Sequence, residues 1–330
     1  KYTYYSTLFR IAFYVSVPLL AYTTFFGSDL NDAQRTIQLF GGVSFQTSDL
    51  AKIALIGYLA RMLTIKQDDI KDFKNAFVPL MLPVLLIVGL ILPENFSTAA
   101  ILFVCSVALL FVGRINFKYL MMFMMIGIVA LTIFILVVMN SDDQGRTVTW
   151  VNRIERFINP SDEDSDEDGI VITDENYQTM HSKIAIASGG LFGKAPGRST
   201  QRNILPHPYS DFIFAIIIEE YGLIGGVFVL MLYMILLFRA IAITVAIPQS
   251  FGGFLSFGLA FLLVMQALIN MGVAVGLLPV TGQPLPLVSM GGTSLMFTGS
   301  AIGVILSVSK EVNKIKEKRD ELKPTTESDN

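Results

Sequence analysis

The chemically most suggestive stretch of the chain runs from Asn203 to Tyr221 and reads NILPHPYSDFIFAIIIEEY. Asp211 stands where a long apolar segment begins, and Glu219 and Glu220 follow inside that segment. Carboxylates are costly in an apolar helix and tend to mark function. With a helical rise of ~1.5 Å per residue, Glu219 lies about 12 Å from Asp211, so the two are not expected to form a catalytic pair.

Asp211 is open to two interpretations at this point. It could serve the helix itself, by favouring its positive end with Ser210 as the N-cap. It could instead be a catalytic carboxylate placed at the membrane surface. Glu219 or Glu220, deeper in the same segment, is expected to anchor a polar network among the helices.

Cations surround this carboxylate in the polar stretch 140–210 and in the loop 27–47. A basic ring around one carboxylate suits the transfer of a group from a phosphate-bearing lipid. The cations would hold the head group and stabilise a leaving pyrophosphate, while the carboxylate would act as general base on an incoming hydroxyl. The ring consists of Arg35, Arg146, Arg153, Arg156, Lys183, Lys194, Arg198 and Arg202.

Two further patterns in the polar stretch leave alternatives open. The segment from Gly189 to Thr200 (GGLFGKAPGRST) is either a flexible connector or a set of backbone N–H groups and cations around an anion, and it is not a P-loop. The acidic run from Asp164 to Glu175 formally fits a calcium-binding loop, although a plain solvated loop is the favoured interpretation. Short helices are expected at 150–157 and 177–188.

Composition limits the class of protein. Of 330 residues, 53% are hydrophobic and only 15% are charged, which excludes a disordered chain. A single cysteine excludes a disulfide scaffold, and the net charge of −3 gives no reason to expect a nucleic-acid partner. His181, His207 and Cys105 are too few for a typical Cys/His metal site, so no metal ligands are predicted.

Apolar runs decide that the fold is an all-α, polytopic membrane protein. A membrane-spanning helix needs about 20 mostly apolar residues. Eight segments qualify or nearly qualify, at 8–26, 50–63, 76–92, 97–112, 119–139, 212–238, 251–278 and 294–308.

Loop charges orient these spans. Lys and Arg gather in every second loop and after the last span, which places those loops and the C-terminal end in the cytoplasm. We therefore expect one transmembrane domain over residues 1–310, a large extracytoplasmic loop at 140–210 and a disordered cytoplasmic tail at 311–330. Lys1 is then cytoplasmic, which fits a chain that lacks an even number of upstream spans, or none.

Three long motifs resemble the SEDS family (shape, elongation, division and sporulation). They are AQRTIQLFGGVSFQTSDLAKIALIGYLAR at 33–61, the stretch GGLFGKAPGRSTQRNILPHPYSDFIFAIIIEEYGLIGG beginning at Gly189, and NMGVAVGLLPVTGQPLPLVSMGGTS at 270–294. The resemblance covers nearly the whole chain and is greatest to FtsW of the Bacteroidetes. It implies the SEDS fold of ten spans with both ends cytoplasmic, of which eight would be visible here.

The resemblance also implies an activity, a substrate and partners. SEDS proteins are peptidoglycan glycosyltransferases that polymerise lipid II at the outer face of the cytoplasmic membrane. Asp211 matches their essential carboxylate, a class B penicillin-binding protein and other division proteins would be the partners, and Mg²⁺ or Mn²⁺ could help neutralise the diphosphate. The expected substrate-binding residues are Lys183, Arg198, Arg202, Arg35, Glu219 and Glu220.

The chain departs from the family at several positions. Thr36 follows Arg35 where the family often has Trp, and Asn95 replaces a frequent Asp. Asp49 stands where Glu is frequent, and Thr281 replaces a frequent Lys. No ligand role is assigned to Thr36, Asn95, Asp49 or Thr281. Two other functions use the same residues and stay open, namely a lipid II flippase and a non-catalytic scaffold for division proteins.

Overall fold

The computed structural model describes residues 3–26, 36–38, 44–93, 95–139, 165–166, 169–170, 174–205 and 209–321. Helices make up almost all of it: α1 (Thr3–Phe26), α2 (Thr47–Ile65), η2 (Phe73–Phe77), α3 (Val78–Ile91), α4 (Phe96–Val112), α5 (Phe117–Met139), α7 (Asp174–Gly189), η4 (Gln201–Asn203), α8 (Ile213–Ala246), α9 (Phe251–Ala274) and α10 (Gly292–Glu321). Two short antiparallel hairpins pair β1 (Thr36–Gln38) with β2 (Ser44–Gln46), and β3 (Ser165–Asp166) with β4 (Gly169–Ile170). The predicted all-α class is confirmed.

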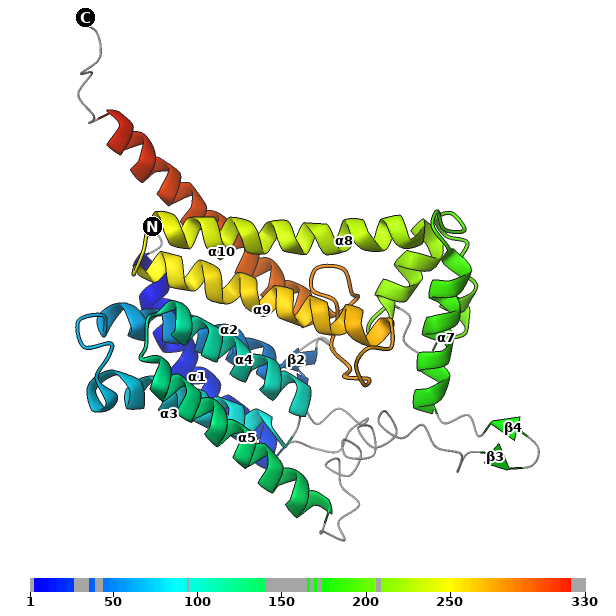
Figure 1. Ribbon diagram of the computed structural model, residues 1–330, viewed down its shortest axis with the longest axis horizontal. Helices are drawn as coiled ribbons and strands as arrows, with labels where there is room; N and C mark the ends of the chain where they lie inside the picture. The colour runs from blue at the N-terminus through cyan, green and yellow to red at the C-terminus, as the bar shows by residue number, and fades with distance from the viewer. Residues whose placement is uncertain are drawn as a thin grey trace, which may run out of the picture.

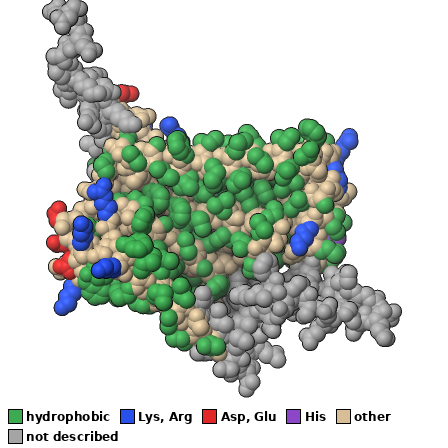
Figure 2. Space-filling view, viewed as in Figure 1, with side chains coloured by type: hydrophobic (Ala, Val, Ile, Leu, Met, Phe, Trp, Pro, Cys, Tyr) green, Lys and Arg blue, Asp and Glu red, His purple; other side chains and the backbone are tan. Residues whose placement is uncertain are grey.

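Each of the eight predicted spans coincides with a helix over most of its length, although the span at 251–278 runs four residues past the end of α9. Five helical segments are long and apolar enough to cross a membrane, namely α1, η2 with α3, α8, α9 and α10, while α4 and residues 117–130 of α5 are shorter apolar helices. Helix α2 also matches a predicted span but is not among these apolar helices, and it carries three charged residues, Asp49, Lys52 and Arg61. Figure 2 shows apolar side chains over the middle of the described surface and charged ones at its two ends, as a multi-pass membrane protein requires.

Helix α9 forms the centre of the bundle. It packs against α2, α4, α8 and α10. In α9, 78% of an 18-residue apolar stretch is buried, compared with 22% of the corresponding stretches in α8 and in α10. Figure 1 shows α8 on one side of α9 and α2 with α4 on the other. Helix α1 begins and α10 finishes at the same end of the bundle, whereas α7 lies at the opposite end (Figure 1). The central helix therefore reaches both the membrane interior and the end that holds the candidate site.

The span predicted at 212–238 is helical, but its helix is interrupted at Gly222. This glycine has φ 73° and ψ −176°, a conformation that is essentially restricted to glycine. Helix α8 consequently has a short first arm, residues 213–221, and a long second arm. Figure 1 shows the short arm beside α7 and turned away from the direction of the long arm.

The polar regions contain helical structure at both α7 and the C-terminal end of α10. The short helix predicted at 177–188 is confirmed by α7, which ends where Gly190 takes a positive φ of 55°. The tail expected to be disordered from residue 311 is instead helical as far as Glu321, since α10 continues beyond the apolar segment. Arg35, half of the acidic calcium-like pattern at 164–175 and the predicted helix at 150–157 lie outside the described residues.

Candidate active site

Asp211 is half-buried in the turn that precedes α8. Its Oδ1 accepts a hydrogen bond of 2.8 Å from Ser210 Oγ. Its Oδ2 faces Gly282, where a Cβ atom would lie 3.8 Å away. Asp211 does not cap α8, because the N-cap residue is Phe212 and no side chain bonds to the first turn. The expectation that Ser210 caps this helix is therefore wrong, and one oxygen of Asp211 faces a neighbour without a side chain.

The turn that carries Asp211 is fixed by α9 and the loop after it. Asn270 Nδ2 donates to the backbone oxygen of Asp211 at 2.8 Å and to that of Gln283 at 2.7 Å. Ser289 Oγ donates to the backbone oxygen of Ser210 at 2.5 Å. These bonds tie the turn to two separate segments of the chain, so the carboxylate is held by a rigid backbone.

The same network continues into α4. Gln283 Nε2 donates to Thr98 Oγ1 at 2.8 Å, although the two residues are 185 positions apart. Thr98 is 1% exposed and sits in the first turn of α4, where its N–H donates to Asn95 Oδ1. Asn95 is thus the N-cap of α4. Hydrogen bonds through Gln283 and Asn270 thus connect α4, α9 and the loop 279–291 to the turn that carries Asp211.

Asn270→Ala tests this network. We expect the free energy of unfolding to fall by about 2 kcal/mol, because a buried and a partly buried backbone oxygen lose their donor. The turnover number is expected to fall about tenfold as the Asp211 turn loosens, with a smaller change in KM. Thermal unfolding in detergent and product formation measure the two effects. Asn313→Ala, on an exposed position of α10, is the control, and equal stability of the two variants would contradict the role of Asn270.

Glu219 is fully buried and bound by the loop that follows α7. Its carboxylate accepts hydrogen bonds from Lys194 Nζ at 2.7 Å and from Thr200 Oγ1 at 2.8 Å. Ser199 Oγ and the backbone N–H groups of Thr200 and Gln201 also donate to it. This saturation argues against direct contact between Glu219 and a substrate. The partners come from this loop and from Ser188 of α7, whose Oγ lies 3.4 Å from Glu219 Oε1. The polar network around Glu219 therefore joins α8 to α7 and the loop after it rather than to another apolar span.

The glycine-rich segment agrees with the second of the two interpretations left open by its sequence. Backbone N–H groups and a cation do surround an anion, but the anion is the protein's own Glu219. The glycines allow the segment to lie directly on the kink of α8. A Cβ atom at Gly189 would lie 2.1 Å from the oxygen of Ile218, and one at Gly193 would lie 2.2 Å from that of Glu220.

The predicted cationic residues occupy different places around the site. Lys183 is exposed on α7, and its side chain lies over Gly276, just after α9. Arg198 is exposed, and Arg202 is half-buried with its N–H bonded to Ser199 Oγ. Because Ser199 also bonds to Glu219, the clamp on Glu219 fixes the backbone that carries both arginines. Glu220 is half-buried, and its backbone oxygen accepts from the N–H of Ala195.

The structure adds residues to the candidate site that the sequence analysis did not assign to it. Asn270, Gln283 and Ser289 hold Asp211 in place, and all three lie in the motif at 270–294. This motif carries part of the resemblance to the SEDS family. Its polar residues cannot be connected to Asp211 without the fold, because they are distant from Asp211 in the sequence. Within the described ranges, no group of three or more His, Cys, Asp and Glu side chains could hold a metal ion.

A second polar cluster lies inside the bundle between α2, α9 and α10. Lys52 Nζ and Asp49 Oδ1 form an ion pair of 2.7 Å, with each side chain 8% exposed. Asp49 Oδ2 has no hydrogen-bond partner and adjoins a cavity of about 20 Å³ that Gln266 and Thr298 also line. This space is large enough for one water molecule. The spacing of three residues within an apolar helix was the available signal for this pair.

Lys52→Met should be strongly destabilising. Asp49 would stay buried without its cation, and removing one member of a buried pair costs about 3 kcal/mol or more. The double variant Asp49→Leu/Lys52→Met is expected to recover most of that loss, since no uncompensated charge is left. Thermal unfolding of the three proteins in one detergent measures this. A double variant that is less stable than Lys52→Met would refute the explanation.

Comparison with known proteins adds the decisive observation. Residues 1–314 match the profile described as cell cycle protein, which unites FtsW, RodA and SpoVE. The chain belongs to the FtsW/RodA/SpoVE family. This confirms the resemblance to SEDS proteins, because the match covers nearly every described element, including the turn of Asp211 and the loop that holds it.

Individual FtsW/RodA/SpoVE relatives agree with this membership. Stage V sporulation protein E of Bacillus subtilis (strain 168) is 35% identical over 82% of this chain and 70% of its own length. A probable peptidoglycan glycosyltransferase FtsW of Geobacter sp. (strain M18) is 34% identical over 88% of this chain and 75% of its own.

Solved structures show the same fold. The chain aligns with a TM-score of 0.70 and 26% identity to a structure titled for the coordination of polymerization and crosslinking by a peptidoglycan synthase complex, covering 94% of this chain and 83% of that one. The rod shape determining protein RodA of Thermus thermophilus gives a TM-score of 0.61 and 27% identity, covering 92% and 79%.

Proposed function

We propose that this chain is a peptidoglycan glycosyltransferase that polymerises lipid II at the outer face of the cytoplasmic membrane during cell division. The observation that carries the proposal is the position of Asp211. It is a half-buried carboxylate at one end of an apolar helical bundle, held by hydrogen bonds to its neighbours and backbone. Curated FtsW relatives are named peptidoglycan glycosyltransferases, which supports the same activity here.

The reaction assigned to Asp211 is an inverting displacement. Asp211 Oδ2 takes the proton of the GlcNAc 4-hydroxyl of the acceptor, and the hydroxyl oxygen attacks C1 of the donor MurNAc. The bond from C1 to the diphosphate oxygen breaks, undecaprenyl diphosphate leaves, and a β-1,4 link forms. Ser210 donates to Oδ1, which leaves Oδ2 as the basic oxygen, and Gly282 presents no side chain to block its approach.

The cations around the site would bind the diphosphate of the lipid. Lys183, Arg198 and Arg202 are assigned this role, with Arg35 as a further prediction. The side chains of Lys183 and Arg198 are exposed on the described surface, and neither is among the donors to Glu219. Glu219 acts as a positioning residue for the arginine-bearing loop, and Glu220 keeps its predicted role in binding. Positive charge near the bridging oxygen would stabilise the leaving group as its negative charge develops.

A divalent cation would have few protein ligands here. Asp211 is the carboxylate at the site, and the described residues offer no cage of three acidic or His/Cys side chains. Mg²⁺ commonly binds through one carboxylate together with substrate phosphates, so Mg²⁺ or Mn²⁺ would arrive largely with the diphosphate. Such an ion would neutralise charge on the leaving group, and no other step depends on it.

A transpeptidase partner is proposed from the same comparisons. One similar structure is titled as a peptidoglycan synthase complex that coordinates polymerization with crosslinking. We assign a class B penicillin-binding protein to the crosslinking role beside this chain, together with other division proteins.

The test separates an enzyme from a flippase and from a scaffold. The protein in liposomes is given lipid II, and glycan strands, released undecaprenyl diphosphate and movement of a fluorescent lipid II across the bilayer are measured. Strands and undecaprenyl diphosphate formed in a constant ratio support the proposal. Lipid movement without strands would support a flippase, and neither activity, with the partner present, would support a scaffold.

A further inference from the structure

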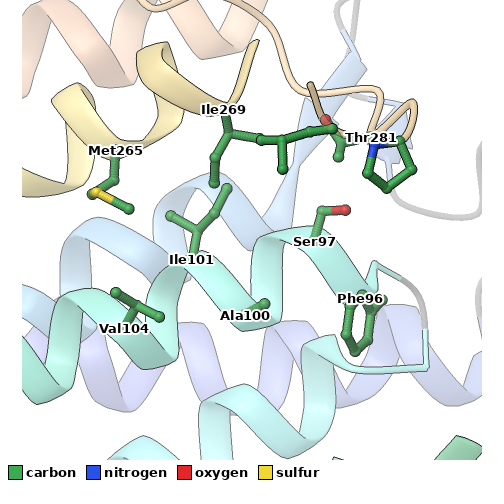
Figure 3. Close-up of a pocket in the computed structure, with 10 residues that line it drawn as sticks. Phe96, Ser97, Ala100, Ile101, Val104, Met265, Ile269 and Thr281 are labelled. Carbon is green, nitrogen blue, oxygen red and sulfur yellow. The ribbon is translucent and has the colours of Figure 1, made fainter. Parts of the chain in front are cut away.

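An open apolar groove runs along the membrane-spanning part of the molecule between α4 and α9. It has a volume of about 210 Å³. This α4–α9 groove is lined chiefly by Ala100, Ile101 and Val104 of α4, Met265 and Ile269 of α9, and Thr281 of the following loop. Figure 3 shows Ile101 and Ile269 pointing toward one another, with Ser97 and Thr281 near one end and Val104 and Met265 near the other.

The direction of the groove follows the axes of the two helices. Ser97 lies in the first turn of α4, and Val104 lies about two turns further, roughly 10 Å along the helix. One end of the groove is therefore at the outer end of the bundle and the other lies within the apolar part of the spans. A molecule that fills it would lie along the spans with one end at the membrane surface.

The outer end of the groove adjoins the proposed reaction site. Thr281 lines the groove, and the next residue, Gly282, is the one that faces Asp211 Oδ2. Ser97 also lines it, and the next residue, Thr98, accepts a hydrogen bond from Gln283. The polar end of an amphiphile at Asp211 would thus be continuous with a tail in the groove.

We propose that the α4–α9 groove binds the isoprenoid chain of the lipid-linked sugar substrate. This inference rests on the proposed function and names the place of the substrate's tail. The lining is hydrocarbon apart from Ser97 and Thr281 at the outer end, which suits an unbranched or methyl-branched chain.

Photocrosslinking tests the groove without requiring catalysis. The full chain in liposomes is exposed to a long-chain polyisoprenyl diphosphate that carries a diazirine in its chain, and labelled peptides are identified. We expect label on α4 and α9. Ala100→Phe, which fills the groove, should reduce this label about tenfold, an energetic difference of about 1.4 kcal/mol. Ala130→Phe, on an exposed position of α5, should leave it unchanged.

Further arms exclude trivial outcomes. Val104→Phe, a smaller change in side-chain size at a groove position that is 45% exposed, should also reduce the label. Thermal unfolding of each variant checks that it is folded. An excess of unlabelled polyisoprenyl diphosphate should compete, whereas phosphatidic acid of the bilayer should not. Competition by both lipids would mean that the groove holds ordinary membrane lipid, and label that Ala100→Phe leaves intact would place the chain elsewhere. Either result overturns the inference.

The outcome is independent of whether the chain polymerises lipid II. Specific labelling without glycan formation would sustain the groove and reject the proposed function. Glycan formation with labelling outside α4 and α9 would support the proposed function and reject the groove as the binding site of the chain. In the active protein, Ala100→Phe is expected to raise KM about tenfold for a long-chain substrate and to have little effect for one with a chain too short to reach Ile101.

Discussion

Replacing Asp211 by Asn is expected to lower the turnover number for glycan polymerisation by about 10³-fold, since general-base catalysis contributes roughly 10² to 10⁴. Asn keeps the size of the side chain and can still accept from Ser210, but it cannot take the proton of the acceptor hydroxyl. Affinity for lipid II should change little, because the proposed binding cations are untouched. Strand synthesis and lipid II binding by the purified protein measure the two quantities.

A matched substitution controls for the loss of one negative charge. Asp69 is exposed in the segment between α2 and η2, at a distance in the fold from α7 and the turn before α8. Asp69→Asn should retain the wild-type turnover number. If Asp211→Asn polymerises lipid II as fast as Asp69→Asn does, Asp211 is not the base.

Replacing Gly222 by Ala is expected to lower the free energy of unfolding by about 3 kcal/mol. The glycine has φ 73° and ψ −176°, and an added Cβ atom would lie 2.2 Å from the backbone oxygen of Leu191. Relief of that clash requires the glycine-rich segment to leave the kink. Hydrogen bonds such as Lys194 N to the Glu219 oxygen, 2.9 Å, would then be lost.

The displaced segment should also weaken substrate binding. It leads into the loop with Arg198 and Arg202, so KM for lipid II should rise together with the loss of stability. Thermal unfolding and a substrate titration measure both effects. Gly303→Ala on α10, where an added Cβ meets nothing within 4 Å, should be neutral or slightly stabilising. Equal melting temperatures for the two variants would show that the kink does not need glycine.

The membrane fold could be predicted because it depends on properties that are local in sequence. Apolar runs located every helix that contributes to the bundle, and the charge of Asp211 beside such a run marked the site. The break at Gly222 could not be predicted in the same way. Its cause is the close approach of the segment 189–193, which is a contact between distant residues rather than a property of the α8 sequence.

The environment of each carboxylate also required the fold. Glu219 and Asp211 are both acidic residues near the start of one apolar segment, and the sequence gives no means to rank their accessibility. In the structure, Glu219 is saturated by Lys194 and the residues around Thr200, whereas Asp211 bonds to the adjacent Ser210 and is half-buried. Likewise, Asn270 could not be connected with Asp211, because their contact joins α9 to the turn before α8.

The most direct test of the proposed mechanism uses liposomes in which the protein has one orientation and lipid II is supplied to one leaflet. Glycan strands are measured for the wild-type protein and for Asp211→Asn. We predict strands from the wild-type protein when lipid II is in the leaflet next to α7, and about 10³-fold fewer from the variant. Wild-type yields from Asp211→Asn, or synthesis only from lipid II in the opposite leaflet, would contradict catalysis by Asp211 at the outer face.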